Sequence, residues 1–323
     1  MTQPCDTINI FNHNTLIMSN IYNIFKTIIR IGIGVFFIVS AILKLLSIDN
    51  FELYIYSFNL LSFPLCGLAA RGIIASEILA GILLIIKVKY KAAWWLTLLM
   101  LIGFSCLLVY VILFRDDSNC HCMGDLVELK PAVSLIKNIV TIALLWLIRK
   151  EEDYPFKWRN WALAGSLVAA FVPPFALFPT DSVYNLFSRS NNLDYNETAF
   201  NGLMADTSMQ NLRLENGNFI IGVISSGCPH CKTGCLKLSE IVNKNQLDTN
   251  RVLFFVWGDS SSVEHFKKET QTEIFQYSAI NPIVAVQISN GTFPKYLFMT
   301  DGNVVKTADS RHLTEKSVKE HLR

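Results

Sequence analysis

The chain has 323 residues, of which 51% are hydrophobic, and its formal net charge is +2 at pH 7. This length accommodates two domains, and the apolar excess in the first 180 residues argues against a wholly soluble protein. The near-neutral charge without a basic patch argues against nucleic-acid binding. Eight cysteines are too few for a disulfide scaffold of this length and too clustered to be incidental.

Five segments are apolar enough for a membrane-spanning helix, which needs about 20 residues. They are residues 21–46, 65–86, 92–114, 132–148 and 161–178. Pro173-Pro174 is expected to break or kink the end of the fifth segment. Residues 1–20 are polar and the first span is too long for a signal peptide, so we expect an uncleaved anchor.

Lysine and arginine in the short connections predict how the spans are oriented. The basic residues expected on the cytosolic side are Lys26, Arg30, Lys87, Lys89, Lys91, Arg149, Lys150, Lys157 and Arg159. Residues 47–64 carry no basic residue and 115–130 carry one at each edge, so both are predicted to face outward. The N-terminus is then cytosolic, and everything after about residue 180 is periplasmic. The aromatic, amphipathic residues 51–63 predict an interfacial or re-entrant helix.

After a polar stretch predicted to be a linker, the pattern changes to alternating strands and helices. Strands are expected at 219–225, 251–257, 295–300 and 303–306, and helices at 229–242, 262–275 and 314–322. Asp301-Gly302 predicts a hairpin turn. This order resembles the thioredoxin fold. The predicted domains are a tail (1–20), a four-helix membrane domain (21–150), a fifth helix (151–180), a linker (181–217) and a thioredoxin-like domain (218–323).

The motif Cys228-Pro229-His230-Cys231 lies where the first strand gives way to a helix. Free N–H groups and the helix dipole favour a thiolate at Cys228, and a thiolate is the nucleophile in thiol–disulfide exchange. Cys231 is predicted to be the buried resolving thiol. His230 would add positive charge or a hydrogen bond to the thiolate, and the Pro-His dipeptide matches the oxidising DsbA type. A metal pair or a static disulfide is the alternative.

Three further features bear on the resemblance to thioredoxin, one in its favour and two that depart from it. Pro294, after Phe293, matches the cis-proline that docks an extended substrate beside the motif in thioredoxin-like proteins. The strand before Cys228 contains no acid or lysine, so the buried proton acceptor of thioredoxin is absent there. Cys235, one turn beyond Cys231, is either a core cysteine or a third redox partner.

Cys120-His121-Cys122 forms a second cysteine pair, in a short polar loop between two apolar segments. A disulfide across so short a span would be strained and therefore relatively oxidising. A metal site with His121 as third ligand is the alternative interpretation.

Lys44 and Glu77 are ionisable residues in or beside the spans, which makes them functional candidates. The alternatives are a snorkelling lysine and a paired structural charge. Cys66 and Cys106 are single cysteines of the kind that usually serve only packing.

Residues 34–138 resemble the MauE/DoxX-like family of membrane proteins over about a third of the chain. The matching features are SAILKLLSIDNF at the end of the first span, Pro64, Glu77, the loop Cys120-His121-Cys122-Met123-Gly124 and Lys137-Asn138. Met123 replaces the Phe that is usual in the family. The resemblance implies a four-helix membrane domain linked to periplasmic disulfide chemistry.

The whole layout is also similar to bacterial vitamin K epoxide reductase homologues, in which a quinone-reducing bundle is tethered to a thioredoxin-like domain. This chain lacks their C-x-x-C and separate loop pair in its membrane part.

These features predict an oxidoreductase anchored in the bacterial inner membrane, with periplasmic protein thiols or disulfides and the lipid bilayer as partners. Electrons are expected to pass between Cys228/Cys231 and Cys120/Cys122. Oxidation of substrate thiols is the favoured direction, because of the Pro-His dipeptide and because no cysteine pair lies on the cytosolic side. A quinone is the expected acceptor, and neither a covalent cofactor nor a bound metal is expected. The alternatives are a TlpA-type reductase and a metal-handling or maturation factor that uses Cys-His-Cys.

Overall fold

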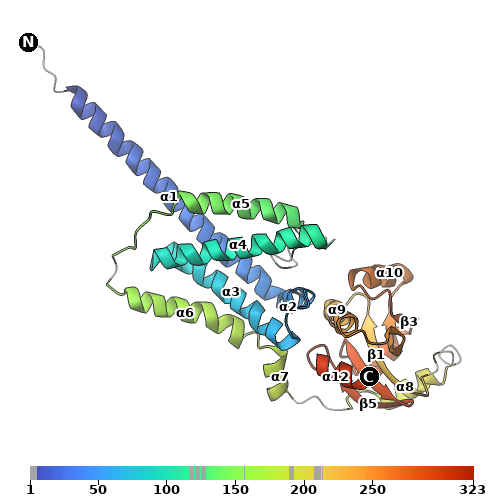
Figure 1. Cartoon of the computed structure of the whole chain (residues 1–323). Helices are drawn as coiled ribbons and strands as arrows, with labels where there is room; N and C mark the ends of the chain where they lie inside the picture. The colour runs from blue at the N-terminus through green and yellow to red at the C-terminus, as the bar shows by residue number, and fades with distance from the viewer. Residues whose placement is uncertain are drawn as a thin grey trace, which may run out of the picture. The chain divides into compact units, whose positions relative to one another are not determined.

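The computed structural model describes residues 6–115, 120, 124, 129–155, 157–188, 193–206, 212 and 214–323, with side chains from residue 20 onward. The chain divides into two compact units. The first unit comprises Met1–Phe51 and Ala69–Phe178, and the second comprises Glu52–Leu68 and Pro179–Arg323. Figure 1 shows the chain coloured from its N-terminus to its C-terminus, with most helices and strands labelled.

The N-terminal part is helical. Its helices are α1 (Asp6–Leu46), α2 (Ile48–Tyr56), α3 (Phe63–Ile86), α4 (Tyr90–Phe114), α5 (Pro131–Leu147) and α6 (Arg159–Ala176). In the described residues, α1 from Asn20 onward, α3 and α4 are long and apolar enough to cross a membrane, and α6 joins them when it is counted with α7 (Asp181–Phe187) as one bent span. The predicted membrane bundle is thereby confirmed in its fold class.

Several helix ends differ from the sequence prediction. Helix α1 begins at Asp6 and continues through residues predicted to form a tail. Helix α5 has 17 residues and is about 25 Å long, slightly short of a hydrocarbon core of about 30 Å. Helix α6 continues through Pro173-Pro174 and ends two residues later, at Ala176. It can continue because each proline removes one backbone hydrogen bond without forcing the helix to stop. In the amphipathic 51–63 segment, the helix ends at Tyr56.

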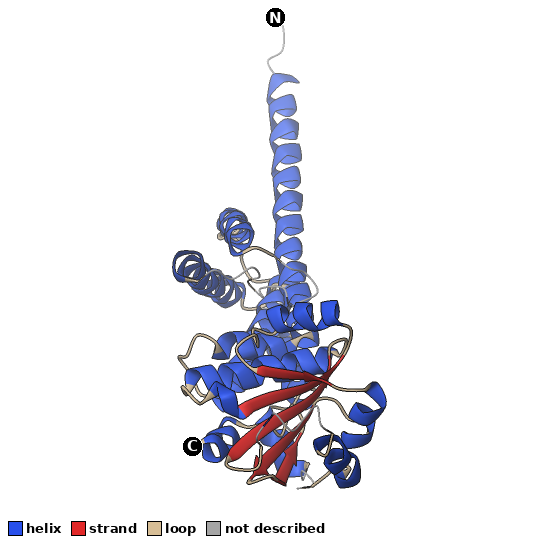
Figure 2. Cartoon of the chain, turned by 90° about the vertical axis from the view of Figure 1, so that its right-hand side faces the viewer, coloured by secondary structure: helices blue, strands red, loops and turns tan. Residues whose placement is uncertain are grey.

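The C-terminal part contains a five-stranded mixed sheet (Figure 2). Its strands are β1 (Asn218–Ser225), β2 (Val252–Trp257), β3 (Gln276–Ala279), β4 (Lys295–Thr300) and β5 (Asn303–Ala308), in the spatial order β3-β2-β1-β4-β5. β1, β2 and β3 are parallel, whereas β4 is antiparallel to both of its neighbours, β1 and β5. The predicted hairpin turn joins β4 to β5, with positive φ at Asp301 and Gly302.

Helices cover both faces of this sheet. They are α8 (Glu197–Met204), α9 (Pro229–Lys244), α10 (Ser260–Glu269), α11 (Pro282–Ile288) and α12 (Glu315–Leu322). Ile220 and Ile224 of β1 belong to a core shared with α9, α10 and α12, whereas Ile221 and Val223 belong to a core shared with α8 and α11. A central strand buried on both faces is a continuous apolar run, which explains the sequence of β1. The predicted α/β thioredoxin-like fold is confirmed.

Several elements of this part were not predicted. β3 is a strand of four residues, mostly polar, that contributes little periodic signal. Helix α11 has a recognisable start, since Asn281 caps it and Pro282 occupies its first position. The stretch 181–217, predicted to be a linker, contains α7 and α8, and Phe200 of α8 is buried in the second core.

Candidate redox site

Cys228 lies at the start of α9, after the end of β1 and a short turn. It is the N-cap residue, and its sulfur accepts a hydrogen bond from the Cys231 N–H at 3.3 Å. Ser, Thr, Asp or Asn usually occupies this position, because an acceptor side chain there satisfies a free N–H of the first turn. The same N–H groups and the helix dipole stabilise a thiolate. The Cys228 side chain is partly exposed, so a substrate can reach it.

Cys231 is fully buried one turn inside the helix. Burial raises the pKa of the Cys231 thiol well above its usual range, although the Ser225 N–H, which donates to this sulfur at 3.5 Å, acts in the opposite direction. A buried thiol that stays protonated is a poor nucleophile toward an external disulfide. This asymmetry fits the predicted roles, in which Cys228 attacks the substrate and Cys231 resolves the mixed disulfide.

Cys235 belongs to the hydrophobic core behind the motif and has no exposed surface. Burial raises the pKa of the Cys235 thiol, and the neighbouring Tyr296 hydroxyl partly offsets this effect. This setting favours the core-cysteine interpretation over a third redox partner.

Phe293 and Pro294 precede β4 and are joined by a cis peptide bond. Pro294 lies close to α9, because a Cβ atom on Gly234 would be 3.0 Å from Pro294 Cγ and 2.5 Å from the Tyr296 hydroxyl. Glycine at position 234 permits this close approach. The Phe293 ring stacks on Trp257 with the ring centroids 6.0 Å apart. The predicted docking residues thus lie against the helix that carries the cysteines.

Pro229 and His230 occupy the first turn of α9 and are both exposed. Pro229 takes the first helical position, where its missing N–H costs no hydrogen bond. In the described part of the chain, no hydrogen bond joins the His230 ring to Cys228. Any effect of His230 on the thiolate would therefore come from its charge.

Of the second predicted cysteine site, the structure describes Cys120 and Gly124. Cys120 is 1% exposed, its N–H donates to the Leu129 carbonyl at 3.1 Å, and its sulfur lies 3.0 Å from the Ser134 hydroxyl of α5. Gly124 has φ +67°, and a Cβ atom there would collide with the Leu43 carbonyl oxygen of α1. Only glycine fits both constraints, which accounts for the glycine of the loop motif. His121, Cys122 and Met123 lie outside the described residues.

Lys44 and Glu77 form a buried ion pair between α1 and α3. Lys44 Nζ lies 2.6 Å from Glu77 Oε1, and the two side chains are only 2% and 4% exposed. Lys44 also donates to the Ser40 hydroxyl at 2.9 Å. The structure therefore brings together the two ionisable residues that the sequence singled out, as a paired charge and not as a snorkelling lysine.

None of the six described cysteines is joined in a disulfide. Cys66 is fully buried and Cys106 is exposed on α4. Among the described residues, no group of three or more His, Cys, Asp or Glu side chains is arranged to hold a metal. Two members of the predicted Cys-His-Cys ligand set, His121 and Cys122, lie outside the described residues.

Three residues of these sites were not predicted from the sequence. Ser134 is the partner of Cys120, Trp257 supports Phe293, and Tyr296 lies beside Cys235. The sequence did contain a signal for two of them. Ser134 is a hydroxyl in the first turn of an apolar helix, and Trp257 is an aromatic residue at the end of a parallel strand. The position of Tyr296 gave none, because a buried aromatic in a strand is the usual pattern.

Comparison with known proteins agrees with this two-part architecture. Residues 22–149 match the family described as methylamine utilisation protein MauE. The chain is 25% identical over 337 aligned positions to protein TlpB of Flavobacterium psychrophilum, covering 86% of this chain and 89% of TlpB. Together with the fold, these matches support a MauE-type membrane domain fused to a thioredoxin-like domain.

Proposed function

We propose that the chain is a membrane-anchored thiol–disulfide oxidoreductase. The observation that carries this proposal is the pairing of a partly exposed Cys228 sulfur at a helix N-terminus with a fully buried Cys231 one turn below it. The setting of Cys228 favours a thiolate, and the setting of Cys231 keeps its thiol protonated until a mixed disulfide has formed. Exchange with an external disulfide requires one thiol of each kind. A static disulfide or a metal pair would gain nothing from this asymmetry.

Cys120 and Cys122 are proposed to exchange electrons with Cys228 and Cys231. In the favoured direction, Cys228/Cys231 as a disulfide accepts two electrons from a substrate dithiol, and Cys120/Cys122 then accepts them from the reduced pair. The substrate backbone docks beside Cys228 at Pro294. The proposed setting is the bacterial inner membrane with the thioredoxin-like domain in the periplasm.

A quinone is proposed as the final acceptor because oxidation requires an outlet for electrons in the membrane. The cavity beside Lys44 and Glu77 is smaller in this structure than a quinone ring requires. That cavity leaves about 20 Å³ for the centre of a water molecule, whereas a cavity that accommodates a benzene ring measures about 150 Å³.

The test is the redox state of Cys228/Cys231 in intact cells, read by alkylating free thiols with a mass tag. Wild type is compared with Cys120→Ala/Cys122→Ala, and Cys66→Ala/Cys106→Ala is the matched control because those two cysteines lie in the helices outside the loop. We expect an oxidised pair in wild type and in the control, and a reduced pair in the loop variant.

The other outcomes contradict specific parts of the proposal. A pair that is reduced in wild type and becomes oxidised in the loop variant would show a reductase. A pair that does not respond to the loop variant would separate the two cysteine sites and favour metal handling by Cys120-His121-Cys122. Bound metal in the purified protein, lost in the loop variant, would establish that alternative.

A further inference from the structure

Helix α7 of the second unit is amphipathic, and its apolar face is uncovered. Val183, Leu186 and Phe187 are three and four residues apart, so they share one face of the helix. All three are exposed, and the exposed fractions of Leu186 and Phe187 reach 80% and 88%. Single exposed apolar residues are common on proteins, but a contiguous apolar face indicates a surface that a partner covers.

The opposite face of α7 is fixed to the second unit by polar contacts. Asp181 Oδ2 lies 2.7 Å from Lys237 Nζ of α9. The Asn185 side-chain amide donates to the Arg311 carbonyl at 3.2 Å. Asp181 and Asn185 are four residues apart, so they share the face turned away from the apolar side chains. The exposed apolar face therefore belongs to a helix that is held in place on its other side.

A second exposed apolar point belongs to the same unit. Leu60 and Leu61 lie just before α3, and both are exposed, Leu60 to 83%. The Leu61 carbonyl accepts a hydrogen bond from Lys244 Nζ of α9 at 2.9 Å. The Phe63 ring, at the start of α3, lies 4.4 Å from Lys237 Nζ. The same helix, α9, therefore holds both this point and α7.

The two apolar points are neighbours on one face of the second unit. One hollow is lined both by the start of α3 and by α7, through Phe63, Pro64, Ser182 and Asn185. Leu61 and Val183 are one or two residues from these lining positions, so the exposed apolar side chains of both segments lie beside the hollow. Together they form a single surface with one class of partner.

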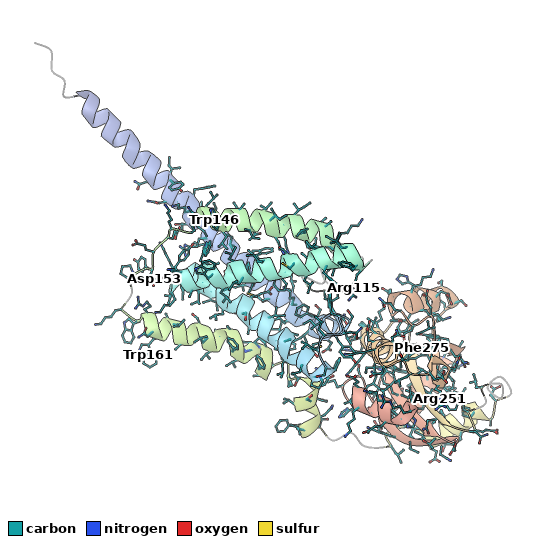
Figure 3. The ribbon with its side chains drawn as sticks, viewed as in Figure 1. Arg115, Trp146, Asp153, Trp161, Arg251 and Phe275 are labelled. Carbon is teal, nitrogen blue, oxygen red and sulfur yellow. The ribbon has the colours of Figure 1, made fainter. Side chains whose placement is uncertain are left out.

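Both segments adjoin helices that are apolar enough to cross a membrane. Leu60 and Leu61 directly precede α3, and α7 follows α6 after a bend of 65°. Figure 3 shows Trp161 of α6 and Trp146 at one end of the helical unit and Arg115 at the other, and exposed Trp is typical of a membrane interface. The 18 residues of α6 are about 27 Å long, close to a hydrocarbon core of about 30 Å. The helix therefore ends near the opposite interface, where α7 begins.

We propose that this surface, formed by Leu60, Leu61, Val183, Leu186 and Phe187, docks the thioredoxin-like domain onto the lipid bilayer. Its apolar side chains enter the boundary between headgroups and acyl chains, as those of interfacial amphipathic helices do. The domain is then attached to the membrane by a surface of its own, in addition to the covalent connections of the chain. This inference does not depend on the redox roles of the cysteines.

Docking fixes the orientation of the helix that carries the redox motif. Cys228 lies at the start of α9, and Lys237 and Lys244 of the same helix hold the two docking segments. The Lys237 side chain is buried, and its partner Asp181 compensates the cost of desolvating its charge. A domain on a flexible tether samples many orientations, whereas the docked domain keeps α9 at one angle to the bilayer.

The experiment measures how often a nitroxide at position 187 collides with oxygen and with a neutral nickel chelate. The full chain is reconstituted into vesicles of phosphatidylethanolamine and phosphatidylglycerol. Phe187→p-acetylphenylalanine supplies a ketone that couples to a hydroxylamine nitroxide, so every native cysteine is kept. Oxygen is apolar and concentrates in the bilayer, whereas the nickel chelate stays in water. We expect the oxygen collision rate to exceed the nickel rate several-fold at this position.

Two further positions complete the experiment. Leu60→p-acetylphenylalanine probes the second docking segment, and the same excess of oxygen collisions is expected there. Ile274→p-acetylphenylalanine is the matched control, because Ile274 is an exposed apolar residue of the same unit outside both segments. It precedes Phe275, which Figure 3 labels, and we expect the nickel rate to be the higher one at this position. All three side chains are exposed, so their replacement leaves the core packing unchanged.

An excess of oxygen collisions at both positions 187 and 60, together with an excess of nickel collisions at position 274, would support the proposal. A nickel excess at position 187 or 60 would overturn it, because that segment would then lie in water. Low rates for both reagents at either position would equally overturn it, since they would show that protein, such as a second copy of the chain, covers the face. The measurement requires no turnover, so its result is independent of the proposed redox function.

Discussion

Cys228 and Cys120 occupy contrasting environments in the two units of the molecule. Around Cys228, the groups that favour a thiolate belong to the backbone, because the sulfur caps the free N–H groups at the start of α9. Around Cys120, the described partner of the sulfur is a side-chain hydroxyl, that of Ser134, and the buried ion pair of the same unit, Lys44–Glu77, is also made of side chains.

This difference follows from what each fold offers. The strand–turn–helix unit of a thioredoxin-like domain ends in unsatisfied backbone donors, which bind an anion without any charged residue. A membrane bundle satisfies nearly all its backbone groups within the helices, so an anion there must be stabilised by polar and charged side chains. The bundle does contain buried ions, Lys44 and Glu77, whose desolvation is costly unless they are paired.

The largest effect is expected from replacing Cys228, the proposed nucleophile of the thioredoxin-like domain. Cys228→Ser should reduce the rate of exchange between the purified full chain and a model disulfide protein by more than about 100-fold, because a hydroxyl is not a nucleophile toward sulfur. Cys231→Ser should accumulate a mixed disulfide with Cys228, visible on non-reducing gels. Cys235→Ala is the control and should retain most of the activity. Loss of activity in Cys235→Ala with intact folding would instead establish Cys235 as a redox partner.

An intermediate effect is expected from a change in the cysteine loop of the bundle. Gly124→Ala places a Cβ atom against the Leu43 carbonyl and a side chain at φ +67°, a conformation that costs an L-residue about 1–2 kcal/mol. The loop should detach locally, and Cys120 should be alkylated roughly tenfold faster, as expected for about 1.4 kcal/mol. Gly103→Ala in α4 is the control, because a Cβ atom there meets nothing within 4 Å. Equal alkylation rates in wild type and Gly124→Ala would show that the loop is not held at this point.

The smallest effect is expected from breaking the ion pair of Lys295, a buried lysine of the second unit whose partner, unlike that of Lys44, is exposed. Lys295 Nζ lies 2.7 Å from Asp194 Oδ2. The Asp194 side chain is 46% exposed, so water screens the attraction between the two charges. Asp194→Asn should lower the free energy of unfolding by about 1–2 kcal/mol, between the values for exposed and buried pairs. Hydrogen exchange of the β1 and β2 amides in the full chain measures this change.

The contribution of Asp194 depends on pH with a definite sign. Hydrogen bonds from Lys295 and Asn290 hold the pKa of the Asp194 carboxyl below its usual value of about 3.9. The stabilisation is therefore present above about pH 4 and is lost as the pH falls through the lower folded-state pKa. The difference between wild type and Asp194→Asn should shrink in that acidic range. A difference that persists at full size would mean that packing, and not charge, is lost in the variant.

Much of the fold was readable from the sequence because its signals are local. Apolar runs of membrane length, the turn at Asp301-Gly302 and the helix start at Pro229 each depend on neighbouring residues alone. Some of the elements that were missed, such as β3 and α8, are short and gain their stability from tertiary contacts, such as those of Phe200 in the second core. Propensity alone does not predict such elements.

The sequence by itself determined the two cysteine motifs, the order of the domains and the candidacy of Lys44 and Glu77, because residue identity and spacing are sufficient for each. Only the tertiary structure decided which groups surround them. It paired Lys44 with Glu77, placed Ser134 beside Cys120 and brought Pro294 against α9. These contacts join residues between 14 and 60 positions apart, and their distances depend on how helices and strands pack, which no local pattern encodes.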